Sequence, residues 1–422
     1  MKVFSKKMVA VLVTGTFVVA ATFLGGNAAS AAPGDPIQMW VRSATSSQAQ
    51  ALVDGWNAVR RQQVKLTVIP NESFLQKVGI AAGAKQLPCI MASDVVYMPN
   101  FVDKGLYADI TANVNSWFFA SKLHPGGITK IDGKIYGVPH TIGMSAIFQN
   151  EVLLKKAGID PKKPLANLKE LSTNAAKVKA LGGDTVGLYY TGGSGGSLAF
   201  TQFPFIWASG AEVVTADGKK SLLDSEKSIA IFKIFNDMYK AGTVPTTVPL
   251  ESGATRNPVF AKGNVGYMLA SNATLQFVPD GPNMKVGVQG IPGLDGGQST
   301  FIGGDSIGIT STCGSQQKDA WKFISWTLST FAQVEIYAKI NQLVMRTDLA
   351  KNKYSVLNPN VAKLNQLIAK GKTPFSLNWG QTFNDPNGPA LGAMQEALFG
   401  KGDPAAVLKA ANDKITASLR GN

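Results

Sequence analysis

Residues 136–160 read YGVPHTIGMSAIFQNEVLLKKAGID, and the rest of the chain is organised around this stretch. Residues 136–139 close a turn that begins at Asp132, and residues 142–148 form a short apolar run. Apolar residues then recur at helical spacing in residues 151–157, and Gly158 ends the pattern. The stretch therefore predicts a strand that leads directly into a helix.

The first 31 residues have the three parts of a secretory signal. Lysines in the first seven residues precede a 17-residue apolar run at 8–24, and Ala-Ser-Ala at 29–31 has the form of a cleavage site. An uncleaved membrane anchor is the alternative, but 17 residues that include glycine and threonine make a short span. We expect residues 1–31 to be a signal peptide that is removed on export.

Without this signal the chain has 38 basic and 27 acidic residues, a net charge of +11. Such a charge suits nucleic acid or an anionic surface. However, the lysines are scattered along predicted helices, and no run of five basic residues occurs. We therefore expect no nucleic-acid partner, and we interpret the charge as serving attraction to an anionic surface or solubility.

About 390 residues exceed what one hydrophobic core usually organises, so we expect two lobes. Strands at 37–41, 65–69 and 88–96 alternate with helices at 48–61 and 73–84. This alternation predicts a mostly parallel α/β sheet that binds ligands at the carboxyl ends of its strands. Those ends carry Arg42, Ser43, Asn71, Glu72 and residues 94–97.

Residues 191–197, TGGSGGS, are expected to form an irregular loop because of their glycine content. Backbone amides in such a loop could cradle a phosphate group. The loop lacks the Gly-Lys-Ser/Thr ending of a P-loop, however, so this motif does not predict a nucleotide site.

Several segments together resemble the extracellular solute-binding proteins of family 1, the maltose-binding-protein-like receptors of ABC sugar importers. The segments that carry the resemblance are residues 136–160, Pro88 with Gly105, Leu106 and Asp109, FAKGNVGYML at 260–269, the Gly-Gly pair at 303–304, and GKGDPAAVLKAANDKI at 400–415. The resemblance implies an α/β, two-lobed, periplasmic-binding-protein-like fold in which a multi-crossing hinge joins two mostly parallel sheets flanked by helices. It places the first lobe at 32–142 plus 295–342, and the second at 143–294 plus 343–422.

The resemblance also implies a function. A receptor of this kind closes around a mono- or oligosaccharide by hinge bending and delivers it to permease subunits that are driven by separate ATPase subunits. It implies a monomer without a cofactor, in the periplasm or outside the cell. Lipid-anchored relatives are cut before a cysteine, whereas Asn27 stands at that place here. We therefore expect no lipid anchor.

Sugars present hydroxyls and flat CH faces, so a sugar receptor needs carboxylate and amide acceptors, arginine donors and aromatic platforms. The residues that we expect to contact the ligand are Trp40, Arg42, Glu72, Asp94, Tyr97, Phe200, Trp207, Asn272, Asp305 and Trp379. Each has a structural alternative: the acids could cap helices, and the tryptophans could be core residues. We expect Asp305→Ala to weaken ligand binding without unfolding the protein. Maltose-specific relatives carry an acid where this chain has Gly143, which argues against maltose itself.

The chain has two cysteines, Cys89 and Cys313, and an oxidising compartment permits one disulfide. The resemblance places both at the end of the first lobe that is remote from the cleft. We expect a disulfide between them, with two unpaired buried thiols as the alternative.

Two other functions remain open on the sequence alone. A receptor of the same fold could take glycerol phosphate or another polar solute, and a secreted glycoside hydrolase would need two carboxylates across its cleft. No sequence motif marks such a pair of carboxylates. His124, His140 and the two cysteines are too far apart in sequence to suggest a metal cluster. We therefore expect a binding protein rather than an enzyme, with no metal.

Overall fold

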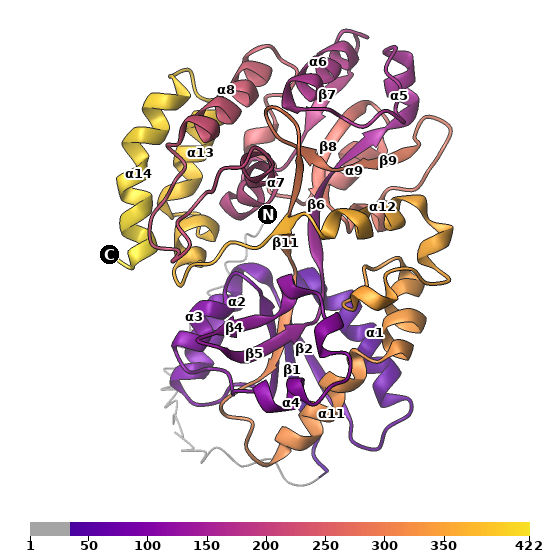
Figure 1. The fold of residues 1–422 in the computed structure, drawn as a ribbon, viewed down its shortest axis with the longest axis vertical. Coiled ribbons are helices and arrows are strands. Elements are labelled where there is room, and N and C mark those ends of the chain that lie inside the picture. The colour runs from indigo at the N-terminus through magenta and orange to yellow at the C-terminus, as the bar shows by residue number, and fades with distance from the viewer. Residues whose placement is uncertain (1–33) are drawn as a thin grey trace, which may run out of the picture.

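Two β-sheets organise residues 34–422, the part of the chain that this computed structural model describes. The predicted signal segment at 1–31 lies outside the described residues. Each sheet forms the centre of one lobe, and strands β6 (Gly143–Asn150) and β11 (Gln298–Gly303) run between the two lobes in Figure 1. The two-lobed α/β architecture that we predict is therefore confirmed.

The first lobe contains a six-stranded sheet of order β2-β1-β3-β12-β5-β4. Alternating residues of β1 (Ile37, Met39 and Val41) are buried in the main core, while Trp40 packs against a smaller cluster under α2. The elements of this lobe are β1 (Ile37–Arg42), α1 (Ser46–Asn57), β2 (Val64–Ile69), α2 (Asn71–Gly83), β3 (Ile90–Asp94), α3 (Met98–Asp103), α4 (Thr111–Asn115), β4 (Thr129–Ile131), β5 (Lys134–Pro139), β12 (Asp305–Ile309) and α11 (Gln317–Thr327).

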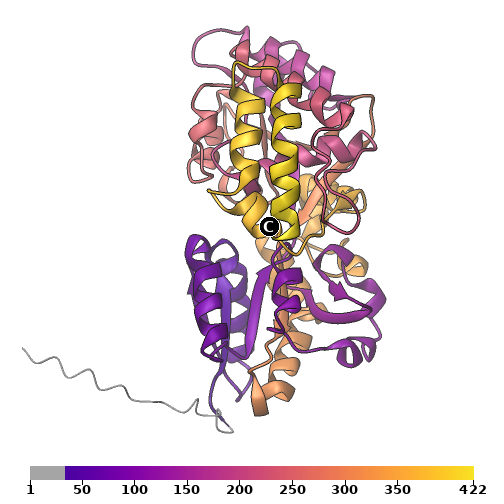
Figure 2. The same cartoon turned by 90° about the vertical axis from the view of Figure 1, so that its left-hand side faces the viewer.

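The second lobe contains a sheet of order β10-β11-β6-β8-β7, with β9 and β13 paired at its sides. Its elements besides β6 and β11 are α5 (Glu151–Lys156), α6 (Leu168–Lys179), β7 (Val186–Tyr189), α7 (Gly195–Ala208), α8 (Glu226–Lys240), α9 (Arg256–Ala261), β8 (Val265–Ser271), α10 (Thr274–Phe277), β9 (Val286–Gln289), β10 (Ile291–Pro292), α12 (Pro359–Ile368), β13 (Gly371–Lys372), α13 (Pro389–Phe399) and α14 (Pro404–Arg420). Helices α13 and α14 lie side by side, and the C-terminal end of α14 lies near the level where the lobes meet (Figure 2).

Both sheets are mixed, so our prediction of mostly parallel sheets was wrong. Strands β1, β2 and β3 pair in parallel, but β12 is antiparallel to β3 and to β5. In the second lobe β6 is antiparallel to β8, β9 and β11. The reason is the hinge: β6 leaves the first lobe and the chain returns through β11 and β12, which brings strands of opposite direction into both sheets.

The chain returns to the first lobe at Gly304, nine residues after the expected boundary at residue 295. Strand β11 still pairs with β6 in the second sheet, and β12 begins at Asp305 in the first. Gly304 has a φ of +101°, and a Cβ here would overlap the carbonyl oxygen of Thr141. Glycine is therefore required where the two chain crossings touch.

The last crossing also comes later than we expected. Leu123 forms a bridge with Arg346, and the backbone N–H of His124 donates to the carbonyl of Met345 at 2.9 Å. Met345 and Arg346 thus contact the first lobe, whereas α12 packs on β9 and β11 of the second lobe.

The glycine-rich segment is partly helical, which corrects our prediction of an irregular loop at 191–197. Helix α7 begins at Gly195, and the Ser194 hydroxyl caps it by accepting a hydrogen bond from the backbone N–H of Ser197. The cap and the buried apolar residues that follow outweigh the low helix propensity of glycine.

A disulfide joins Cys89, just before β3, to Cys313, just after β12. Because β3 and β12 are antiparallel neighbours, the start of one strand lies beside the end of the other. The bond lies at the opposite end of these strands from Asp94 and Asp305, as we expected.

Candidate functional site

Three charged side chains meet where the first sheet faces the hinge. Arg42 ends β1, Asp94 ends β3, and Asp305 begins β12 directly opposite Asp94. Arg42 donates to Asp305 Oδ1 through Nε, at 3.1 Å, and through Nη2, and its Nη2 lies 3.1 Å from Asp94 Oδ2. One guanidinium therefore bridges two carboxylates, and we call these three residues the Arg42 cluster.

Asp305 is the buried anchor of the Arg42 cluster. Its side chain is 0% exposed, whereas those of Arg42 and Asp94 are 11% and 20% exposed. Its second carboxylate oxygen accepts a hydrogen bond from Thr45 Oγ1 at 2.8 Å, and its backbone N–H donates to Thr141 Oγ1 at 2.9 Å. Asp305 therefore orients Arg42, and the partly exposed Arg42 and Asp94 are the members that a solute can reach.

The charges of the cluster shift one another's pKa values. Burial by itself lowers the pKa of Arg42, but the charges of Asp305 and Asp94 outweigh it and raise that pKa, so Arg42 stays charged. Burial raises the pKa of Asp94, against the opposing effect of Arg42. The carboxylate of Asp94 has already lost part of its water through burial. A solute that donates hydrogen bonds to this carboxylate therefore has less water to displace.

Tyr97 links this edge of the first lobe to the second lobe. Asn384 Nδ2 donates a hydrogen bond to Tyr97 Oη at 2.9 Å. Asn384 ends the π-helical turn η10 (Gly380–Asn384), and a Cβ at Gly380 would lie 3.1 Å from the Tyr97 ring. The absence of a side chain at Gly380 allows the turn to approach the ring.

The structure buries the two expected tryptophans of the second lobe. Trp207 and Trp379 are 5% and 1% exposed, and both pack around Phe301 of β11, with ring centroids 5.5 and 6.4 Å away. Phe200 is half-buried and lies 5.3 Å from the same ring. The two tryptophans thus occupy core positions, which was the alternative that we left open.

Asn272 serves the hinge, and Trp40 serves the packing of the first lobe. Asn272 Oδ1 accepts from the backbone N–H of Met144 at 2.8 Å, and its Nδ2 donates to the carbonyl of Ile142 at 3.3 Å, so its amide holds the hinge strand. Trp40 is half-buried beneath Lys77, whose Nζ lies 5.0 Å from the ring centroid. The side chain of Glu72 lies outside the described part of the structure.

Sequence reasoning missed Thr45 and Thr141, which hold Asp305 in place. The sequence did place Thr45 near the site, because Thr45 lies three residues after Arg42, at the residue that precedes α1. Thr141 carried no comparable signal, since only the folded hinge brings residue 141 beside residue 305.

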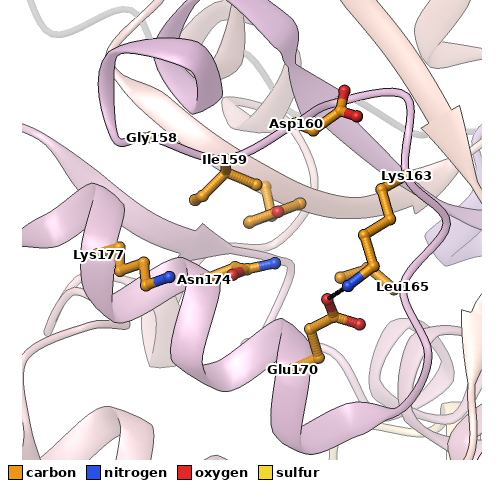
Figure 3. A pocket seen from close by; sticks show the side chains of 9 residues that line it. Gly158, Ile159, Asp160, Lys163, Leu165, Glu170, Asn174 and Lys177 are labelled. Atoms are coloured by element: carbon orange, nitrogen blue, oxygen red, sulfur yellow. Dashed lines mark hydrogen bonds and ion pairs between the residues drawn. The ribbon is translucent and has the colours of Figure 1, made fainter.

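A separate hollow of about 190 Å³ lies in the second lobe (Figure 3). Lys163 Nζ donates to Glu170 Oε1 at 2.9 Å at its edge, and Glu170 also accepts from the backbone N–H of Ala166 at 2.7 Å. Asn167 caps α6 beside it. Because these groups stabilise the start of α6, the hollow has a structural explanation, and we assign it no ligand.

Within residues 34–422, no three His, Cys, Asp or Glu side chains are grouped as a metal site would need. The same residues contain no helix with the length and apolar character that a bilayer span requires.

Solved structures with the same fold include a sugar-binding protein and a receptor that was solved with acarbose. The sugar-binding protein MalE of Xanthomonas citri has a TM-score of 0.79 and 16% identity over 92% of this chain and 98% of its own. The GacH receptor of Streptomyces glaucescens, solved without ligand and with acarbose, has a TM-score of 0.77 and 23% identity over 91% and 98%. At these identities the likeness shows the fold.

Comparison with protein sequences gives the family. A binding protein of Brucella abortus is 29% identical over 367 residues, which cover 84% of this chain and 85% of its own. The sn-glycerol-3-phosphate-binding periplasmic protein UgpB of Yersinia pseudotuberculosis is 24% identical over 220 residues, 50% of this chain and 48% of its own. The model of the family described as "Bacterial extracellular solute-binding protein" matches residues 59–355. This chain therefore belongs to the bacterial extracellular solute-binding proteins, a family of binding proteins rather than enzymes.

Proposed function

We propose that the protein is the extracytoplasmic receptor of an ABC importer and that it binds a carbohydrate between its lobes. The observation that supports this proposal best is the Arg42 cluster: an arginine donor and a carboxylate acceptor lie partly exposed where the first lobe meets the hinge. Sugar hydroxyls both donate and accept, so one ring can bond to Arg42 and Asp94 together.

The geometry of the cluster argues against hydrolysis. A glycosidase needs one carboxylic acid that can release a proton and a second carboxylate across the sugar ring. Here one guanidinium contacts both carboxylates, and Asp305 is buried with both oxygens engaged. The two carboxylates are therefore arranged to hold Arg42, which suits binding.

The proposal also covers the export of the protein, its oligomeric state and its transport partners. The chain is exported by the signal at 1–31, carries no lipid anchor, and acts as a monomer that presents its closed form to permease subunits with separate ATPase subunits. Ligand favours the closed form because it contacts both lobes only there. The half-length likeness to UgpB makes glycerol phosphate the second candidate solute.

A thermal-shift screen of the mature protein tests the proposal with mono- and oligosaccharides, polyols and glycerol phosphates. We expect one carbohydrate to raise the melting temperature, because a ligand at about 100 times its dissociation constant adds roughly 2.7 kcal/mol to the stability. Chromatography should then recover that carbohydrate intact. A shift with glycerol phosphate alone would change the solute class, and a cleaved sugar would contradict the assignment as a binding protein.

A pair of arginine variants locates the site. Arg42→Gln should abolish the ligand-induced shift, because it removes the charged donor of the cluster. Arg60→Gln alters an exposed arginine of the same lobe and should keep the shift. Equal shifts in both variants would show that the ligand binds elsewhere.

A further inference from the structure

A second hollow, distinct from that of Figure 3, lies between the two lobes. Its volume is about 300 Å³, and both lobes line it. The first lobe contributes residues of α2 and α3 together with Val96, Tyr97, Lys104 and Leu106. The second lobe contributes Leu377, Asn378, Gly380 and Gln381. We call it the interlobe pocket, and it exists only while the lobes are close together.

The walls of the interlobe pocket are mainly apolar. Leu75, Val78, Phe101 and Leu377 supply hydrocarbon surface. The polar part of the lining consists of the amides of Asn100, Asn378 and Gln381 and the side chain of Lys104. The size is sufficient for more than one aromatic ring, because an engineered apolar protein cavity of about 150 Å³ already binds benzene. A bare sugar ring carries hydroxyls around its rim, and hydroxyls placed against such walls would lose water without gaining partners.

Residues 94–97 join the pocket to the Arg42 cluster along the backbone, although Asp94 and Arg42 themselves do not line the pocket. Asp94 belongs to the cluster and accepts a hydrogen bond from the backbone N–H of Val96 at 3.2 Å, while Val96 and Tyr97 line the pocket. A single ligand can therefore place a polar part against Asp94 and Arg42 and an apolar part in the pocket.

The second-lobe wall is held in place before any ligand arrives. Asn378 Nδ2 donates to the carbonyl of Leu419 at 3.0 Å, and Gln381 Nε2 donates to that of Ser418 at 3.3 Å. Both carbonyls belong to the last turn of α14. A wall that α14 already fixes costs little ordering entropy on binding.

We propose that the interlobe pocket binds an apolar substituent on the carbohydrate, so that the preferred ligands are glycosides with an aryl or alkyl aglycone. This inference rests on the proposed function, and it narrows the solute class. The sugar contacts the Arg42 cluster, and the aglycone fills the space between α2, α3 and η10. Because both lobes line the pocket, a filled pocket stabilises the closed form.

The test uses matched pairs of ligands, the 4-nitrophenyl and the methyl glycosides of each common hexose, with affinities measured by calorimetry. We expect the aryl glycoside of the recognised sugar to bind about tenfold or more tightly than its methyl glycoside, because a buried ring removes apolar surface from water. Equal affinities would overturn this inference and leave the proposed function intact. If neither member of any pair binds while another carbohydrate raises the melting temperature in the thermal-shift screen, this inference is overturned and the proposed function stands.

Two glycine variants test whether the preference for aryl glycosides arises in the interlobe pocket. Gly79 lines the pocket in α2, and a Cβ there has no heavy atom within 4 Å, so Gly79→Leu fills the pocket without a backbone clash. Gly83→Leu is the matched control, since Gly83 ends the same helix in open space and does not line the pocket. The ratio of aryl to methyl affinity should fall toward one in Gly79→Leu and stay unchanged in Gly83→Leu. An aryl preference that survives Gly79→Leu would show that the aglycone binds elsewhere and would overturn the assignment.

Discussion

Tyr97 of the first lobe accepts a hydrogen bond from Asn384 of the second lobe at 2.9 Å. The lobes thus contact each other directly at the site where we expect the solute. Because the bond is a side-chain contact between two lobes, it favours the closed arrangement by the net value of one hydrogen bond, about 0.5–1.5 kcal/mol.

Asn384→Ala should therefore shift the unliganded protein toward an open form. Small-angle X-ray scattering should report a larger radius of gyration for this variant, and Tyr97→Phe should behave similarly because it removes only the hydroxyl. Asn387→Ala is the control, as Asn387 is an exposed residue just after the same turn. Identical scattering from Asn384→Ala and the unmodified protein would show that this bond does not hold the lobes together.

Asp305→Ala should destabilise the first lobe, which revises our expectation that this change leaves the fold intact. The substitution leaves the Arg42 guanidinium without its closest partner in a nearly buried position, and breaking such a pair costs about 3–5 kcal/mol. Urea unfolding measures the loss. Asp103→Ala removes an exposed acid, 45% exposed beside Lys104, and should change the stability by less than about 1 kcal/mol. A small loss for Asp305→Ala would mean that water replaces the carboxylate.

The two histidines should make the protein less stable in mild acid. Burial lowers the pKa of His140 and of His124 from 6.5 to about 4 in the folded state. The unfolded chain therefore binds more protons between pH 6.5 and pH 4, and stability falls as the pH falls through this window. Each histidine should contribute a loss of roughly 2 kcal/mol between pH 7 and pH 5.

His140 is the better residue for this test, because its ring is 1% exposed and both ring nitrogens lack a hydrogen-bond partner among the described residues. In His140→Phe the difference in unfolding free energy between pH 7 and pH 5 should shrink by roughly 2 kcal/mol, the contribution of His140. An unchanged difference would show that other groups cause the acid sensitivity.

Gly304→Ala should be strongly destabilising, because the hinge crossing requires both a positive φ and space beside Thr141. We expect a loss of more than about 2 kcal/mol in thermal or urea unfolding. Gly392→Ala is the opposite case: Gly392 lies within α13, has open space around it and should gain up to about 1 kcal/mol from the higher helix propensity of alanine. Equal effects at the two positions would contradict the role of Gly304.

The sequence predicted Arg42, Asp94 and Asp305 as separate cleft residues, because the ends of strands follow from local patterns. It did not predict that Arg42 bridges the two carboxylates. Arg42, Asp94 and Asp305 each stand at one end of an apolar run, and the ends of neighbouring strands meet at one edge of a sheet. The directions of the strands were not predictable in this way, since pairing depends on how β6 and β11 cross between lobes.

The aromatic residues show where sequence reasoning stopped. Trp207 and Trp379 have the same local pattern whether they stack on a sugar or pack in a core. Phe301 decides between these roles, because β11 brings it between them from a distant part of the chain. The interlobe pocket could not be predicted from the sequence either. Its walls come from α2, α3 and η10, and these elements form a pocket only when the two lobes are close together.

The bond between Cys89 and Cys313 closes a covalent ring, and the whole excursion of the chain from β6 to β11 lies inside it. A protease that cuts once within this excursion leaves both fragments joined through the first lobe. Helices α13 and α14 lie outside the ring, and packing and hydrogen bonds, but no disulfide, hold them to the tethered part of the second lobe. The second lobe thus consists of a tethered insertion and a terminal tail, and only the tail can be released by a single cut while the disulfide is intact.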